Sequence, residues 1–458
     1  MADSYDVIVL GAGPTGENVA DRAVRGGLTA VVVESELVGG ECSYWACMPS
    51  KALLRPVAAV SEADHVRGAV GARLDPPEVL ARRDYFADFW KDDGQVAWLK
   101  NAGIDLFRGP GRIAGNRIVK VGDTGLRARH AVVVATGSRA VVPPPLAAVA
   151  PWTSREATSA HAVPGRLAIV GGGVVGCEMA TAWQALGARV TLLARGRLLG
   201  RLPAFVSELV ARELRAAGVD VRLGTGVAGA SRDGARGPVT LTLGDGTSVE
   251  ADEVLAATGR APRTDDIGLE TVGIAPGSWL DVDDTLRVRA VDGGWLYAAG
   301  DVNHLALLTH MGKYQARVCG DAIAARAQGR EPAVTDRSSR TCVPQVVFTL
   351  PEVAAVGLTK EQAEAAGHTV RVVEYEIGNV AGAGLFADGY SGHAQMIVDD
   401  NSKVILGMTL AGPGVGEMIH AATIAVAGKV PLERLWHAVP SYPTISELWL
   451  RLLEAYGL

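Results

Sequence analysis

Two stretches of the 458-residue chain share one plan: an apolar strand, a glycine-rich turn that opens a helix, and a second apolar strand. They read YDVIVLGAGPTGENVADRAVRGGLTAVVVESE and GRLAIVGGGVVGCEMATAWQALGARVTLLARGR. The glycines of such a βαβ unit allow a tight turn and bring the backbone close to a pyrophosphate at the helix N-terminus. We therefore predict an α/β fold with two Rossmann-like dinucleotide-binding domains. The predicted phosphate-binding glycines are Gly11, Gly13, Gly16, Gly171, Gly173 and Gly176.

The two copies differ after the second strand. In the first copy this position is Glu34, a carboxylate suited to bind ribose hydroxyls. The same offset in the second copy reaches Ala194, and Arg195 and Arg197 follow it. Guanidinium groups bind phosphate through paired hydrogen bonds, so this pattern favours NADP(H) over NAD(H) as the second nucleotide. The alternative is that both arginines are ordinary surface residues.

Composition excludes several classes of function. The net charge is -6 without a basic cluster, which argues against a nucleic-acid partner. No apolar run approaches the length of about 18 residues that spans a membrane. The first residues lead directly into a strand pattern without the basic segment of a secretion signal, so we expect a cytoplasmic protein. Only five cysteines occur, and they are scattered, which argues against a disulfide scaffold.

Two of these cysteines, Cys42 and Cys47, lie in the segment GGECSYWACMPSKALL. Pro49 favours a helix that starts near Met48, since proline is tolerated in a first helical turn, and this leaves Cys42 in the preceding loop. Cys47 then lies at a helix N-terminus, where the dipole stabilises a thiolate, and Lys51 is one turn away. A reactive thiol is therefore predicted, with two unrelated buried cysteines as the alternative. A zinc site is disfavoured because no second ligand cluster accompanies the pair, and we expect no metal.

At this point the sequence resembles the class I pyridine nucleotide-disulfide oxidoreductases, the family of dihydrolipoamide dehydrogenase, glutathione reductase and mercuric reductase. The resemblance extends over nearly the whole chain. The cysteine segment is similar to the family's redox-active GGxCxxxxCxPSK motif. The other similar segments are VVVATGS (132–138), VLAATGRAP (254–262), LYAAGDV (296–302) and PQVVFTLPEVAAVGLT (344–359).

The resemblance implies cofactors and a role for each matching residue. FAD and NADPH are the implied cofactors, and Cys42 and Cys47 form the implied redox-active disulfide. Cys47 would contact the flavin, and Cys42 would attack a small-molecule or protein disulfide. Lys51 and Glu178 would pair beside the flavin. The implied cofactor contacts are Gly11, Gly13, Gly16, Glu34, Thr136, Gly137, Gly259, Gly300 and Asp301 for the flavin part, with Gly171, Gly173, Gly176, Arg195 and Arg197 for the nicotinamide nucleotide.

One segment departs from the family pattern. The family ends in a HPTxSE-like stretch whose histidine and glutamate protonate the leaving thiolate, but the corresponding stretch here is YPTISE. Tyr442 occupies the histidine position and Glu447 is retained. A free tyrosine titrates near 10, so Tyr442 is a poor proton donor at neutral pH. His437 is nearby but out of register. Two alternatives therefore stay open: a quinone or metal-ion reductase on the same scaffold, and a non-catalytic redox sensor.

The resemblance also implies a domain order and a homodimer. An FAD-binding domain would cover residues 1–150 and be completed by a central part at 266–336. An NADP(H)-binding domain would occupy 151–265, and an α+β dimerisation domain would occupy 337–458. The bulky spacer residues Tyr44 and Trp45 have two interpretations, packing in the core or shaping the substrate face.

Overall fold

A computed structural model describes residues 3–235 and 237–458 of the chain. The chain forms two compact units, each built from separate segments. The first unit consists of Met1–Pro49, Asp84–Ala140 and Arg260–Arg340, and the second of Ser50–Arg83, Val141–Gly259 and Thr341–Leu458.

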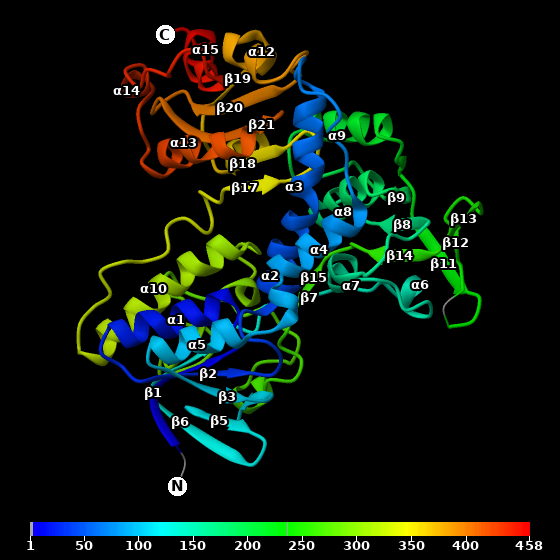
Figure 1. The fold of residues 1–458 in the computed structure, drawn as a ribbon. Helices are drawn as coiled ribbons and strands as arrows, with labels where there is room; N and C mark the ends of the chain where they lie inside the picture. Colours follow the sequence, from blue (N-terminus) through cyan, green and yellow to red (C-terminus); the bar gives the residue numbers. More distant parts are fainter. Residues whose placement is uncertain (1–2, 236) are drawn as a thin grey trace. The chain divides into compact units, whose positions relative to one another are not determined.

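The first unit is built on a seven-stranded sheet (Figure 1). The parallel strands consist largely of buried valine and isoleucine, as expected for a sheet that is covered on both faces. β1 is central: its Val7 pairs with Ala30 of β2 on one side and with Ala131 of β6 on the other. In spatial order the strands are β3 (Ile104–Arg108), β2 (Ala30–Glu34), β1 (Asp3–Leu10), β6 (Thr124–Val134), β5 (Ile118–Val121) and β4 (Gly111–Ile113), and β16 (Leu296–Ala298) pairs with β6.

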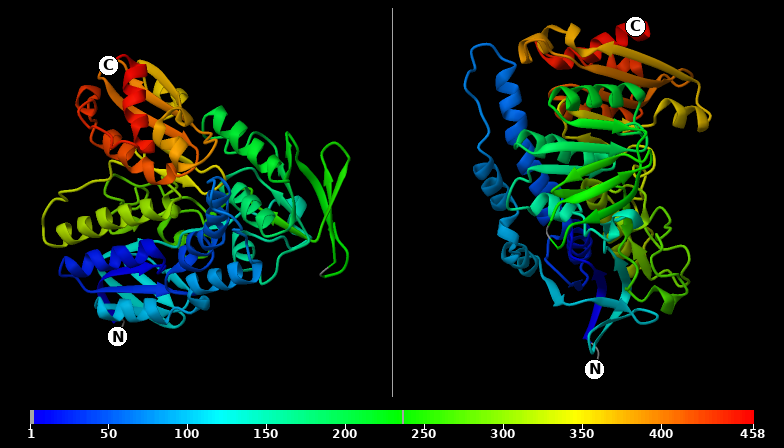
Figure 2. Two further views of the ribbon diagram at one scale, coloured as in Figure 1. Left: turned by 45° about the horizontal axis from the view of Figure 1, so that its top comes forward. Right: turned by 90° about the vertical axis from the view of Figure 1, so that its right-hand side faces the viewer.

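Two helices of the first unit, α1 (Pro14–Arg25) and α10 (Thr309–Ala327), lie side by side in the views of Figures 1 and 2. Small residues allow this close approach, because a side chain at Gly320 would meet Arg22 at 2.5 Å. Arg22 also forms a two-pronged ion pair with Asp321, at 2.8 and 2.6 Å. The remaining elements of this unit are α2 (Gly40–Tyr44), η1 (Asp88–Trp90), α5 (Asp93–Asn101), β7 (Ser138–Ala140), β15 (Arg260–Pro262), η2 (Leu269–Val272) and η3 (Asp301–Asn303).

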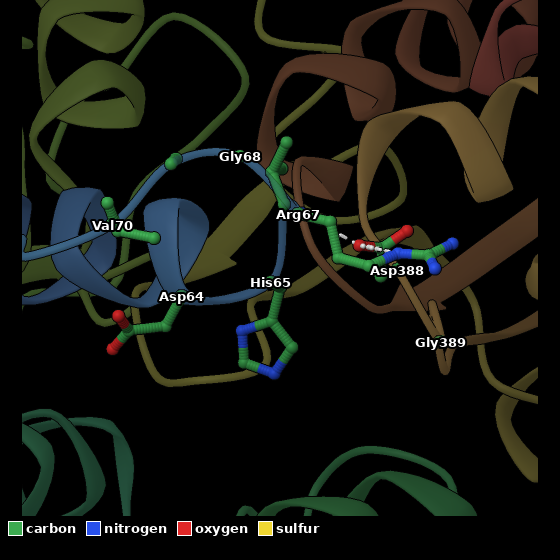
Figure 3. Close-up of a pocket in the computed structure, with 9 residues that line it drawn as sticks. Asp64, His65, Arg67, Gly68, Val70, Asp388 and Gly389 are labelled. Carbon is green, nitrogen blue, oxygen red and sulfur yellow. Dashed lines mark hydrogen bonds and ion pairs between the residues drawn. The ribbon is translucent and has the colours of Figure 1, made fainter.

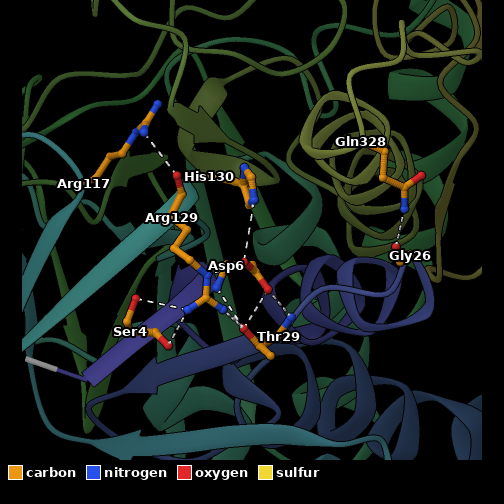
Figure 4. Close-up of polar contacts among 8 residues, drawn as sticks. All are labelled: Ser4, Asp6, Gly26, Thr29, Arg117, Arg129, His130 and Gln328. Carbon is orange, nitrogen blue, oxygen red and sulfur yellow. Dashed lines mark hydrogen bonds and ion pairs between the residues drawn. The ribbon is translucent and has the colours of Figure 1, made fainter.

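A polar cluster fastens the start of β1 to its neighbours (Figure 4). Asp6 accepts a hydrogen bond from Nε of Arg129 at 2.6 Å and another from the backbone N–H of Thr29 at 2.8 Å. Nη2 of Arg129 also donates to the hydroxyl of Thr29 at 2.9 Å. The hydrogen bond from Arg129 is the main cause that holds the pKa of Asp6 well below its usual range.

The second unit contains the second βαβ repeat, which confirms that the two glycine-rich stretches share one plan. Its parallel sheet has the order β10 (Asp220–Leu223), β9 (Arg189–Ala194), β8 (Arg166–Val170) and β14 (Glu253–Ala256). Trp183 of α8 is fully buried in the core beside this sheet. The other elements are α6 (Pro144–Ala147), α7 (Ser154–Ser159), α8 (Val174–Ala185), α9 (Ala204–Ala216), and the antiparallel strands β11 (Val227–Arg232), β12 (Val239–Leu243) and β13 (Ser248–Ala251).

The C-terminal part of the second unit is an antiparallel sheet with helices. Its strands follow the order β17 (Gln345–Val347), β18 (Val353–Gly357), β21 (Val404–Ala411), β20 (His393–Asp399) and β19 (Val370–Glu376). The helices are α11 (Lys360–Ala365), α12 (Ala381–Phe386), α13 (Val415–Ala427), α14 (Leu432–Leu435) and α15 (Leu448–Tyr456), with η4 (Ile377–Asn379) and η5 (Ile445–Glu447).

Two helices cross the boundaries between the segments. α3 (Cys47–Asp64) begins in the first unit and continues in the second. α4 (Pro76–Phe86) begins in the second unit and ends in the first. α3 therefore begins at Cys47 itself, one residue before the predicted start, with Pro49 in its first turn as expected.

Candidate active site

Two of the three glycines in the first glycine-rich turn, Gly11 and Gly16, have no space for a side chain. Gly11 has a φ of +97°, and a Cβ there would lie 2.6 Å from the carbonyl oxygen of Ala135. A Cβ at Gly16 would lie 1.9 Å from the carbonyl oxygen of Gly11. Gly13 caps α1. The sequence uses glycine here because any side chain would separate the strand from the helix that follows it.

Glu34 closes this turn at the end of β2. Its Oε2 accepts a hydrogen bond from the backbone N–H of Ala12 at 2.7 Å, and its Oε1 accepts one from Glu36 at 2.8 Å. Two backbone donors thus orient the carboxylate beside the glycine turn.

A second group of predicted cofactor residues surrounds Asp301. The Ser138 hydroxyl donates a hydrogen bond to Oδ2 of Asp301, and Arg260 donates to the same hydroxyl at 2.6 Å. Burial raises the pKa of Asp301, while Ser138 and Arg260 counteract this effect. The preceding Gly300 has a φ of +81°, and Thr15 occupies the space that a Cβ there would need.

Thr136 and Gly137 lie at the end of β6, in the same unit as Asp301. The Thr136 hydroxyl donates to the carbonyl of Arg263 at 2.7 Å, and Gly137 has a φ of +74°. Arg263 in turn donates to Glu41 at 2.6 Å. This network holds the segment before the cysteine pair to the strand that ends in the first ATG motif.

The second glycine-rich turn repeats the geometry of the first. Gly171 has a φ of +128°, and its Cβ would lie 2.1 Å from the carbonyl oxygen of Ala257. A Cβ at Gly176 would lie 1.9 Å from the carbonyl oxygen of Gly171. Gly173 caps α8, and Gly259 has a φ of +140°. Both turns therefore have the backbone shape that a dinucleotide pyrophosphate requires.

The arginines after β9 have different environments. Arg197 donates from Nη2 to the carbonyl oxygens of Gly200 and Leu202, each at 3.0 Å, so it fastens its own loop. Arg195 is exposed, and its guanidinium makes no ion pair in the part of the chain that the structure describes. Sequence reasoning missed Arg201, which is also exposed and lies at the end of the same loop.

Cys42 and Cys47 lie close together, and both are free thiols in this structure. Cys42 belongs to the short helix α2, not to a loop as predicted, because Gly39 and Gly40 adopt positive φ values that turn the chain into a helix before the cysteine. The pKa of the Cys42 thiol is raised, first by its hydrogen bond with Cys47, then by burial and by the charge of Cys47.

Thr309 is a residue of this cluster that sequence reasoning missed. Its hydroxyl lies 3.2 Å from Sγ of Cys47, within hydrogen-bond distance. It is the first residue of α10 and lies 262 positions after Cys47 in the sequence. The chain offered one signal, the short polar pair Thr309 and His310 at the start of a helix.

The spacer between the cysteines packs in the core. Tyr44 is only 2% exposed, and its hydroxyl donates to the carbonyl of Val38 at 2.9 Å. Nε1 of Trp90 donates to the carbonyl of Tyr44 at 3.0 Å. Trp45 packs edge-on against Tyr44, with ring centroids 5.7 Å apart. The structure thus supports the packing interpretation for Tyr44.

Lys51 and Glu178 pair directly in the second unit. Nζ of Lys51 donates to Oε2 of Glu178 at 2.8 Å, and the backbone N–H of Phe348 donates to Oε1 at 3.0 Å. The ammonium also lies 4.9 Å from the centroid of the Phe348 ring. Glu178 is 3% exposed, so these two donors replace water as the partners of its carboxylate.

Tyr442 and Glu447 do not form the donor pair that the family pattern would provide. Tyr442 is 76% exposed. Glu447 is 8% exposed, and its Oε1 accepts from Arg451 at 2.6 Å. Its Oε2 is buried without a hydrogen-bond partner among the described residues. His437, the out-of-register histidine, is exposed.

A separate pocket of about 540 Å³ lies in the second unit, after the end of α3 (Figure 3). It is lined by residues 64–70 with Asp388 and Gly389. Asp388 joins its two sides, because its carboxylate accepts from the backbone N–H of Arg67 at 2.8 Å and its own N–H donates to the carbonyl of His65 at 2.7 Å. None of the predicted site residues lines this pocket.

Two features are absent from residues 3–235 and 237–458 of the chain. No helix there is long and apolar enough to cross a membrane. No group of three or more histidine, cysteine, aspartate or glutamate side chains there could hold a metal ion.

Comparisons with known proteins agree with this geometry. Residues 5–329 match the family described as pyridine nucleotide-disulphide oxidoreductase, and residues 343–452 match its dimerisation domain. Dihydrolipoyl dehydrogenase 3 of Pseudomonas aeruginosa is 35% identical, with 98% of this chain and 97% of that protein covered. Dihydrolipoyl dehydrogenase of Haloferax volcanii is 31% identical, with coverages of 99% and 96%.

Two solved structures have the same fold. LpdA from Mycobacterium tuberculosis is 25% identical and gives a TM-score of 0.85 with both chains fully covered. The Cu(II) complex of the C43S mutant of the HOCl-induced flavoprotein disulfide reductase RclA from Escherichia coli is also 25% identical, with a TM-score of 0.85 over 99% of each chain. These matches confirm the predicted fold class. The chain belongs to the pyridine nucleotide-disulphide oxidoreductase family and is an FAD-dependent enzyme of that class.

Proposed function

We propose that the protein is an NADPH-dependent reductase of a small-molecule or protein disulfide, acting through Cys42 and Cys47. The observation that supports this most directly is the contact between the two thiols at the start of α10. One thiol attacks a substrate and the other resolves the intermediate, a division of roles that needs two adjacent cysteines.

The cysteine pair would reduce the substrate disulfide in two thiol–disulfide exchange steps. The Cys42 thiolate attacks one sulfur of the substrate, which forms a mixed disulfide and releases the first substrate thiolate. The Cys47 thiolate then attacks the sulfur of Cys42, which forms the Cys42–Cys47 disulfide and releases the second thiolate. Both released thiolates take up protons, and two electrons from NADPH restore the dithiol.

The first unit fits FAD on the observations of its own residues. The cramped turn at Gly11 and Gly16 brings backbone N–H groups to a pyrophosphate, and the carboxylate of Glu34 is oriented for a ribose hydroxyl. Asp301, at the end of the late strand, would bind the ribityl chain. When bound, FAD supplies the transfer of electrons from the nicotinamide to the disulfide, which side chains cannot perform.

NADPH is proposed over NADH on the charge that follows β9. Glu34 of the first repeat has no acidic counterpart there, and Arg195 and Arg201 present unpaired guanidinium groups in the described part of the chain. Arg197 supports them by holding the loop through two carbonyls. A 2'-phosphate would satisfy these positive charges, whereas the ribose hydroxyl of NADH would not.

A second candidate is a quinone or metal-ion reductase on the same scaffold. Two observations favour it: Tyr442 is exposed, and Glu447 accepts a hydrogen bond from Arg451. The described residues therefore do not form the proton-donating pair that the family pattern would provide. Reduction of such an acceptor does not require a general acid for a leaving thiolate. For either acceptor, the match to the dimerisation domain supports a homodimer.

The test is an anaerobic titration of the purified protein with NADPH, read in the visible spectrum. A long-wavelength absorption at two electrons per subunit, together with two new thiols, would support the disulfide reductase. Direct bleaching without new thiols would favour the second candidate or a redox sensor. Cys42→Ser should retain quinone-dependent oxidation of NADPH and lose all disulfide reduction, and retained disulfide turnover would contradict the role of Cys42.

A further inference from the structure

Three residues form one face of α10, namely Thr309, Lys313 and Arg317, which we call the α10 stripe. They are spaced by four residues, so they are neighbours along one side of the helix. The stripe begins at the cysteine pair, because the Thr309 hydroxyl lies 3.2 Å from Sγ of Cys47. Lys313 is therefore one helical turn from this contact, with about 5–6 Å between the Cβ atoms of neighbouring stripe residues.

The direction of helical side chains brings Lys313 closer to the cysteines. Each Cα–Cβ bond in a helix tilts toward the N-terminus, which for α10 is the end at Thr309. Lys313 is exposed, and its ammonium forms no hydrogen bond or ion pair in the described part of the chain. Its charge is therefore not neutralised by an anion among the described residues. The positive end of the α10 dipole lies on the same side.

The stripe has a cost in the absence of a partner anion. Lys313 and Arg317 are like charges four residues apart, a spacing at which they repel each other and destabilise a helix. Arg317 is likewise exposed and without an ion pair in the described part of the chain. A negative charge near Lys313 would offset this repulsion by attracting the lysine ammonium group.

The cysteine pair supplies that charge in the proposed exchange reaction. Cys42 must ionise to attack, yet its hydrogen bond with Cys47, its burial and the charge of Cys47 all raise its pKa. Two groups act in the opposite direction, the hydroxyl of Thr309 and the charge of Lys313. Of these two, only Lys313 has a positive charge that can stabilise the thiolate of Cys42.

One further acid experiences the charge of Lys313. Glu17 of α1 is 8% exposed, and its Oε1 has no hydrogen-bond partner among the described residues. Burial and the charge of Glu34 raise the pKa of Glu17 to about 7, while Lys313 lowers it. The groups that act on this part of the site are therefore Cys42, Cys47, Glu17, Glu34, Thr309 and Lys313.

We propose that Lys313 is a positioning residue that stabilises the thiolate of Cys42 during disulfide exchange. This proposal rests on the proposed function for its physiological meaning. It gives the chain a positive charge that acts on the attacking thiol, in a protein whose C-terminal segment has Tyr442 in place of the family's histidine.

The test measures the ionisation of Cys42 directly. The holoenzyme is reduced with a phosphine, pulsed with iodoacetamide between pH 6 and 9.5, and quenched with acid, and modification of the Cys42 peptide is measured by mass spectrometry. In Lys313→Met the midpoint of the alkylation profile should rise by about one pH unit, which slows modification below the midpoint up to about tenfold. Lys313→Arg should retain the profile of the natural protein.

Arg317→Met is the matched control, because it removes the next cation on the same stripe, one turn further from the cysteines. Its midpoint should not change. An unchanged midpoint in a folded Lys313→Met or Lys313→Gln protein would overturn the proposal, and so would an equal shift in Arg317→Met. Phosphine reduction makes the result independent of NADPH. Failure of NADPH to generate two thiols in the natural protein would instead contradict the proposed function.

Discussion

Lys51 and Glu178 are joined by a hydrogen bond of 2.8 Å although they are 127 positions apart in the sequence. The carboxylate is almost completely buried, and its second donor is the backbone N–H of Phe348. The pair thus connects α3 to α8 and to the segment after β17 within the second unit. The burial of the carboxylate determines how much stability the protein loses when either partner is removed.

Lys51→Met should destabilise the protein, because it leaves the charge of Glu178 buried with one backbone donor. The expected loss of unfolding free energy is about 1–3 kcal/mol, below the value for a fully buried pair since Lys51 is partly exposed. Urea denaturation at pH 7.5 measures it. Arg55→Met, which removes an exposed cation of the same helix, should cost much less. Equal losses in both variants would contradict the importance of the buried pair.

Glu17→Gln should stabilise the protein at alkaline pH. The folded-state pKa of about 7 lies above the ordinary value of 4.5, so the buried charge costs stability as pH rises through this interval. The gain should be absent near pH 4.5 and reach up to about 3 kcal/mol at pH 8. Thermal unfolding at both pH values tests this. A variant that is equally stable or less stable than the natural protein at pH 8 would contradict it.

Asp6→Asn should change the acid end of the stability profile. The folded-state pKa of Asp6 is depressed, chiefly by the hydrogen bond from Arg129, so its contribution is present above the unfolded-state pKa and is lost as pH falls. The natural protein should therefore lose stability below about pH 4 more steeply than the variant. The slope of the melting temperature between pH 5 and 3 is the measurement. Parallel profiles would exclude Asp6 as a main source of acid sensitivity.

Gly16→Ala and Gly176→Ala should separate the two nucleotide sites. In each case the added Cβ would lie 1.9 Å from a backbone carbonyl oxygen, so the turn must shift. Gly16→Ala should be purified with little flavin. Gly176→Ala should retain flavin and lose NADPH binding, measured by calorimetry with the oxidised nucleotide. Normal flavin content in Gly16→Ala would contradict the assignment of the first turn.

The double variant Arg195→Ala, Arg197→Ala should raise the Michaelis constant for NADPH much more than that for NADH. Loss of a phosphate contact of this kind reduces affinity by roughly tenfold or more, since hydrogen bonds to charged groups contribute about 1.5–3 kcal/mol. Single variants distinguish direct contact from support of the loop. Arg195→Ala should produce the change in preference, whereas Arg197→Ala should affect both nucleotides. An unchanged preference in the double variant would contradict NADPH specificity.

Sequence reasoning succeeded where local chemistry determines structure. The two glycine turns, the strand before each turn and the helix after it follow from steric demands within a few residues, so Gly11 and Gly171 could be interpreted without a structure. Pro49 likewise located the start of α3 to within one residue. These features do not depend on distant parts of the chain.

The features that the sequence did not predict correctly depend on tertiary structure. Cys42 is helical because Gly39 and Gly40 turn the chain and because Tyr44 is anchored in the core, and this anchoring is a tertiary effect. Thr309 reaches Cys47 only through the folding of the whole first unit. The bonds that engage Arg197 with loop carbonyls also depend on a loop conformation that the sequence pattern does not specify.

The anchored spacer has a consequence for the strength of the reductant. Because Tyr44 is fixed through both its hydroxyl and its carbonyl, the chain between the two sulfurs cannot open freely after reduction. The thiols stay at a high effective concentration with respect to each other, which favours ring closure over separation. A dithiol that closes readily has a more negative reduction potential, so it gives up its electrons more completely. A buried aromatic side chain thus favours closure of the pair without taking part in electron transfer.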